Sequence, residues 1–84
     1  MTLIIPESLQ KELDEKLISV ADVEEVVRQA EASGDVFFEQ ATDVRVASMV
    51  TPGITLWVEY RETGPDTFEV LSAYYHRMRF HQGE

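Results

Sequence analysis

The densest group of side chains that could carry chemistry lies near the C-terminus. The segment FEVLSAYYHRMRF, Phe68–Phe80, contains His76, Arg77 and Arg79, and His81 follows it. A histidine can act as a general acid or base near neutral pH, and arginine can hold a phosphate group. Neighbouring side chains of a strand nevertheless point to opposite faces, which separates His76 from Arg77. We therefore favour pairing of these cations with carboxylates over catalysis.

The remaining sequence has no motif for a metal or a phosphate group. Two histidines and no cysteine provide no recognised spacing of metal ligands. A calcium-binding loop, a glycine-rich phosphate loop and a nucleophile elbow are also missing. We expect no metal and no cofactor.

The charge of the chain bears on its partners. Sixteen acidic residues against seven basic ones give a formal net charge of −9. Such a charge repels nucleic acid and anionic membranes. The sequence shows no apolar run of about 20 residues, no signal-peptide pattern and no cysteine. We therefore expect an acidic cytoplasmic protein whose partner is another protein or a second copy of itself.

Eighty-four residues are enough for one domain. Leucines recur at every fourth position over residues 6–18, which predicts an amphipathic helix with Pro6 in its first turn. Apolar residues at helical spacing predict a second helix over residues 20–33. Ser19 would cap its start and Gly34 would end it.

From Asp35 onward the apolar period changes to two, which is typical of strands. The predicted strands cover residues 36–40, 44–50, 54–62 and 67–79. The segments between them contain turn residues, so consecutive strands should pair antiparallel. The predicted fold is α+β, with two N-terminal helices on one face of a four-stranded antiparallel meander, in the order ααββββ.

The register decides which side chains face the helices. A three-residue loop, Thr51–Gly53, sets Val50 opposite Ile54 and Val46 opposite Val58, which makes one face rich in valine; a two-residue loop would mix the faces.

The loop before the last strand has two possible lengths. Five residues place Phe68, Val70, Ser72, Tyr74 and His76 on the core face, and four residues place Leu71, Ala73 and Tyr75 there. We favour five, because Phe68 and Val70 form the better core pair.

The other face has no helix left to cover it. It is predicted to carry Arg45, Met49, Trp57, Glu59, Leu71, Tyr75 and Arg77. Large uncovered apolar side chains often mark a partner surface. We therefore predict a partner-binding surface of Trp57, Met49, Tyr75 and Leu71.

Helices followed by a meander whose last strand contains VLSAYYHRMR resemble the small ribonucleases and toxins of the barnase, colicin and RelE/BrnT kind. The resemblance implies RNA cleavage without a metal, by side chains on the open sheet face. The candidate residues would be Arg45, Arg61, Tyr75, His76, Arg77 and Arg79. The charge of −9 differs from the basic character of those toxins. The first expectation is thus a protein-binding or accessory domain without enzymatic activity, and the alternative is a ribonuclease.

Overall fold

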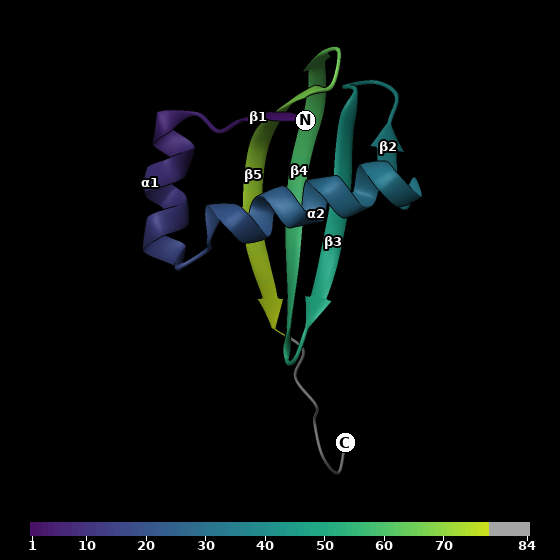
Figure 1. Ribbon diagram of the computed structural model, residues 1–84. Helices are drawn as coiled ribbons and strands as arrows, with labels where there is room; N and C mark the ends of the chain where they lie inside the picture. Colours follow the sequence, from purple (N-terminus) through teal and green to yellow (C-terminus); the bar gives the residue numbers. More distant parts are fainter. Residues whose placement is uncertain (78–84) are drawn as a thin grey trace.

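A computed structural model describes residues 1–77, although the side chain of Arg77 is not included in that description. The chain forms two helices and a five-stranded sheet (Figure 1). The elements are β1 (Thr2–Ile4), α1 (Glu7–Lys16), α2 (Val20–Ser33), β2 (Phe37–Glu39), β3 (Val44–Thr51), β4 (Ile54–Gly64) and β5 (Thr67–Arg77). The end of the strand predicted over residues 67–79 lies outside the described residues, as do Arg79 and His81.

The predicted class α+β is confirmed, but the four-stranded antiparallel meander is wrong. The sheet has the order β1-β5-β4-β3-β2, and β1 runs parallel to β5, with Leu3 opposite Phe68. Three residues before a proline are too short to show strand periodicity. β1 forms by pairing with the first residues of β5, at the edge of the sheet. Its formation therefore depends on a contact between segments that lie far apart in the sequence.

Local signals explain the helix ends. α1 starts directly after Pro6 and stops at Leu17, which has a left-handed backbone (φ 59°) and an 85% exposed side chain. The Oγ of Ser19 accepts a hydrogen bond from the amide of Ala21 at 3.1 Å, and α2 ends at Gly34 (φ 78°). The predicted boundaries of these helices are thus close to the observed ones. Neither helix is long and apolar enough to cross a membrane.

The core lies between α2 and the sheet. Figure 1 shows α2 crossing one face of β3, β4 and β5, while α1 stands beside β5. The fully buried side chains with the largest volumes are Leu13, Val23, Val26, Val27, Leu56, Val58, Tyr60 and Val70. Within residues 1–77 no helix covers the opposite face of the sheet, which we call the open face.

The predicted register of β3 and β4 is wrong by one residue. Thr51 pairs with Ile54, so the loop contains only Pro52 and Gly53, and Ala47 lies opposite Val58. Gly53 has φ 76°, the left-handed conformation that a type II turn requires after proline. The one-residue difference moves every side chain of β3 to the other face.

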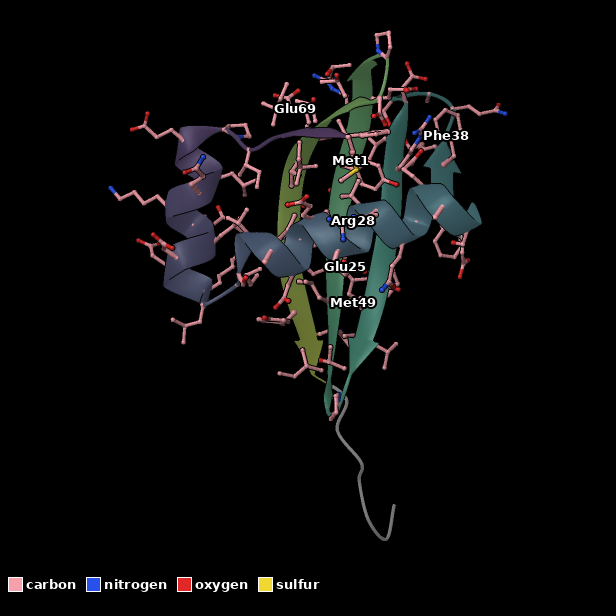
Figure 2. The ribbon with its side chains drawn as sticks, in the orientation of Figure 1. Met1, Glu25, Arg28, Phe38, Met49 and Glu69 are labelled. Carbon is pink, nitrogen blue, oxygen red and sulfur yellow. The ribbon has the colours of Figure 1, made fainter. Side chains whose placement is uncertain are left out.

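This shift exchanges the two faces of β3. Ala47 is buried in the core cluster and Met49 packs against it, so Met49 lies on the helix side (Figure 2). Val46 and Val50 occupy the open face. Valine favours strands whether or not it is buried, so the valine-rich alternation did not identify the core face.

A β-bulge makes each of the two predicted registers of β5 right for one half of the strand. Tyr60 pairs with Val70, but Glu59 pairs with Ser72, which leaves Leu71 as an extra residue on β5. Before the bulge, Phe68 and Val70 face the helices, and both are buried. After the bulge, the alternation is reversed. The loop before β5 is also shorter than predicted, since Gly64 pairs with Thr67.

Candidate protein-binding face

The centre of the open face consists of rows of side chains that lie side by side on three strands. Read from β3 through β4 to β5, the rows are Val46–Glu59–Ser72, Ser48–Trp57–Tyr74 and Val50–Thr55–His76. Phe37 of β2 extends the first row, because it pairs with Val46. The large apolar members form what we call the open-face patch: Phe37, Val46, Val50, Trp57 and Tyr74.

Several side chains of the open-face patch are unusually exposed. Phe37 is 74% exposed and Val50 is 70% exposed, while Tyr74 is 38% exposed. Trp57 is half-buried at the centre of the patch. Single exposed apolar residues are common on protein surfaces, but several aromatic side chains together on one uncovered face are typical of an interface.

A small hollow lies within this patch. Its volume is about 90 Å³, and it is lined by Asp35, Val36, Phe37, Val46, Ala47, Ser48 and Trp57. This volume is far below the several hundred Å³ of ordinary small-molecule pockets. The hollow is therefore too small for an ordinary small-molecule ligand.

Among the side chains that the structure describes, acidic groups outnumber basic ones around the open-face patch. The hydroxyl of Tyr74 donates to Oε2 of Glu59 at 3.5 Å, a long contact, and burial together with Glu59 raises the pKa of Tyr74. Arg61 is opposite Glu69, with 3.6 Å between Nη2 and Oε1, so its charge is balanced. Asp35 lies at the hollow. A partner surface with lysine or arginine would complement these carboxylates.

The four predicted partner-binding residues are not brought together. Trp57 is on the open face, as predicted. Met49 and Tyr75 are on the helix side: Met49 pairs with Leu56, and Leu56 pairs with Tyr75. Leu71 is the bulge residue and is 37% exposed. The register explains the separation, because one residue of shift reverses the face of β3 and the bulge reverses the face of β5.

Arg45 was expected on the open face, but it lies on the helix side. Its Nη1 donates to Oε2 of Glu31 at 3.0 Å, and Nη2 is 3.5 Å from Oε1 of Glu62. The guanidinium carbon lies 5.8 Å from the ring centres of both Phe38 and Phe68. Arg45 is therefore neutralised by two carboxylates and stacked between two rings.

Tyr60 completes this cluster. Its hydroxyl donates to Oε2 of Glu31 at 2.7 Å, while the residue itself is completely buried. Burial raises the pKa of Tyr60, and the hydrogen bond and negative charge of Glu31 raise it further. The cluster joins α2 to β3 and β4, in addition to the apolar core between the helix and the sheet.

The other predicted catalytic residues are spread over the fold. His76 is exposed on the open face opposite Thr55, and not on the core face where the favoured register placed it. Tyr75 lies on the helix side and Arg61 is paired with Glu69. Arg79 lies outside the described residues, and of Arg77 only the backbone is described. Within residues 1–77, no group of three or more His, Asp or Glu residues could hold a metal ion.

The sequence prediction missed most of the open-face patch. Phe37, Val46, Val50 and Tyr74 were not predicted as partner-binding residues. A usable signal was present for two of them, because Pro-Gly marks a turn, and a loop of Pro52 and Gly53 alone places Val46 and Val50 on the open face. The position of Tyr74 depends on the bulge, and no local sequence motif predicts that bulge.

Comparison of the chain with models of protein families, with curated proteins and with solved structures finds no match. The function is therefore inferred from the open face itself.

Proposed function

We propose that this chain is a protein-binding domain that docks a basic partner protein on its open face. The observation that carries the proposal is the open-face patch, where Phe37, Val50 and Tyr74 are exposed around the half-buried Trp57. Burying such side chains against a partner removes apolar surface from water, and aromatic residues are enriched in interfaces for this reason.

Charge supports a basic partner. The chain has a net charge of −9, and Glu59 lies on the open face in addition to the pair that Glu69 forms with Arg61. A partner with lysine or arginine around an apolar centre would associate faster and in the right orientation. We expect the affinity to fall as the ionic strength rises, because salt screens charges at a surface.

The test of this proposal starts with photo-crosslinking in the cells that make the protein. A photoreactive phenylalanine analogue replaces Phe37 in one variant and Leu17 in the control variant. Leu17 is 85% exposed but belongs to the end of α1, away from the open face. We expect a discrete crosslinked protein from position 37 and none from position 17.

The crosslinked protein is then purified and its binding is measured by calorimetry. Phe37→Ser should weaken binding by about tenfold, since truncation of an apolar interface anchor costs about 1.4 kcal/mol or more. Leu17→Ser removes similar exposed apolar surface and should leave the affinity unchanged. Equal affinities for wild type and Phe37→Ser would overturn the proposal.

The ribonuclease function remains an alternative proposal with its own test. The described arginines of its candidate set, Arg45 and Arg61, are both paired with carboxylates, which weakens support for a phosphate site. Purified wild type and His76→Ala are incubated with single-stranded RNA, and we expect no cleavage by either. Cleavage by wild type that His76→Ala abolishes would replace the binding proposal.

A further inference from the structure

The second half of β3 forms an edge of the sheet. β2 pairs only with Val44, Arg45 and Val46, at the start of β3. In the sheet order, no other strand of residues 1–77 lies on that side, so Ala47–Thr51 has a neighbour only in β4. A strand edge is a row of main-chain donors and acceptors without partners in the sheet.

The alternation of an antiparallel ladder identifies which groups face this edge. Thr51 closes the two-residue hairpin with Ile54, so its main chain is directed toward β4. The main-chain N–H and C=O groups of Met49 and Ala47 also point toward β4. The N–H and C=O groups of Ser48 and Val50 therefore point away from β4, toward the free edge. Their side chains lie on the open face, so the edge and the open-face patch are continuous.

The opposite edge of the sheet is protected, and β3 is not. β1 pairs with the first residues of β5, and Nζ of Lys16 donates to the carbonyl oxygen of Ala73 at 3.3 Å. A lysine at an edge is a common device against strand addition. The segment Ala47–Thr51 has no charged residue and no proline. Strand addition is thus obstructed at β5. At β3, Asp35 and Val36 line the hollow beside Ser48, and the edge is open from Ser48 toward Thr51.

We propose that the Ser48–Val50 edge of β3 binds an extended segment of the partner protein as an additional strand. This inference rests on the proposed function and specifies how the partner is recognised. Main-chain hydrogen bonds would hold the segment, and its alternate side chains would lie beside Val50 on the open face and beside Met49 on the helix side. Because the chain has a charge of −9, the segment should contain lysine or arginine among its apolar residues. A second copy of the chain would bring the same negative charge, which disfavours it as the occupant.

The experiment uses a phage-displayed library of random linear peptides as the probe, selected on the full chain. We expect the selected peptides to alternate apolar residues with other residues, including lysine or arginine. Their affinities are measured for wild type, Val50→Pro and Val50→Thr. Proline at position 50 removes the N–H that faces the edge and leaves the ladder with β4 intact, whereas threonine keeps the donor and the branched shape.

Val50→Pro should weaken binding by about tenfold or more, because one hydrogen bond is lost and a carbonyl group of the peptide keeps no partner. Val50→Thr should change the affinity less than about threefold, on the same scale. Val50→Lys is a second variant for the case in which the proline variant does not fold, and it should weaken binding through repulsion of the basic segment. Hydrogen exchange of the Ser48 and Val50 amides should slow when the peptide is bound.

The outcomes separate this inference from the proposed function. Unchanged affinity for Val50→Pro and Val50→Lys, with unprotected amides at Ser48 and Val50, would overturn strand addition. If Phe37→Ser still weakened those peptides, binding on the open face would stand. A library without any binding peptide would overturn strand addition, while the crosslinking experiment would decide the proposed function independently. Sedimentation that showed a dimer of wild type but not of Val50→Pro would identify a second copy as the occupant and refute the basic segment.

Discussion

The hydrogen bond between Tyr60 and Glu31 should be a major contribution to the stability of the fold. The hydroxyl of Tyr60 belongs to a completely buried residue and donates to a carboxylate at 2.7 Å. Hydrogen bonds to charged groups contribute about 1.5–3 kcal/mol, so Tyr60→Phe should lower the free energy of unfolding by about 2 kcal/mol. In a chain of this size, about 2 kcal/mol corresponds to a decrease of roughly 8–16 °C in Tm.

Tyr74 provides a matched control for this measurement. Its hydroxyl also donates to a glutamate, but at 3.5 Å and on an exposed face. Tyr74→Phe should therefore change the free energy of unfolding by less than about 0.5 kcal/mol. Urea unfolding followed by circular dichroism gives both values. Equal effects of the two substitutions would refute a special contribution of the Tyr60–Glu31 hydrogen bond to the stability of the fold.

A double-mutant cycle tests whether the effect belongs to this pair. Glu31→Gln removes the charge that both Tyr60 and Arg45 use, and it should cost about 2 kcal/mol by the same reasoning. The double variant should cost less than the sum of the single variants by about 1 kcal/mol, because once Glu31 is replaced by glutamine, Tyr60→Phe loses only a hydrogen bond to a neutral acceptor. Additive effects would mean that Tyr60 and Glu31 act independently.

Three further outcomes follow from the geometry. Burial and Glu31 raise the pKa of Tyr60, so the tyrosine of the unfolded state loses its proton at a lower pH than that of the folded state. The free energy of unfolding should therefore fall by about 1.4 kcal/mol per pH unit above about pH 10. Urea unfolding at alkaline pH should show a shallower fall for Tyr60→Phe. Gly53→Ala should cost about 1 kcal/mol, since φ is 76°, and a thermal scan that shows no decrease in Tm would contradict the turn. Ala47→Leu should lower the free energy of unfolding by about 1–3 kcal/mol by overfilling the core, whereas Ser48→Leu on the open face should lower it by less than about 0.5 kcal/mol. The reverse order in urea unfolding would mean that Val46 and Val50, and not Ala47, face the helices.

The sequence by itself determined the class of the fold and the position of most elements. The Ser19 cap and Gly34 define α2 through contacts within one turn, and the same contacts appear in the structure. Of the period-four leucines, Leu9 and Leu13 are buried on α1, whereas Leu17 lies beyond its end and is exposed. The strands from Phe37 onward are separated by turn residues whose backbone preferences are also local. The presence of an open face also followed from the predicted elements, since two helices on one side of a sheet leave its other side uncovered.

Only the tertiary structure decided which side chains occupy that face. β1 pairs with β5, which lies near the other end of the described residues, and a strand of three residues has too little pattern to predict this pairing. The branched side chain of valine favours a strand but does not show which face it occupies. A turn of two residues rather than three exchanged Met49 for Val50 in the open-face patch. The bulge at Leu71 then moved Tyr74 and His76 to the open face and Tyr75 to the helix side. In a strand, a shift of one residue exchanges core and surface, so the turn and the bulge decide which side chains α2 covers.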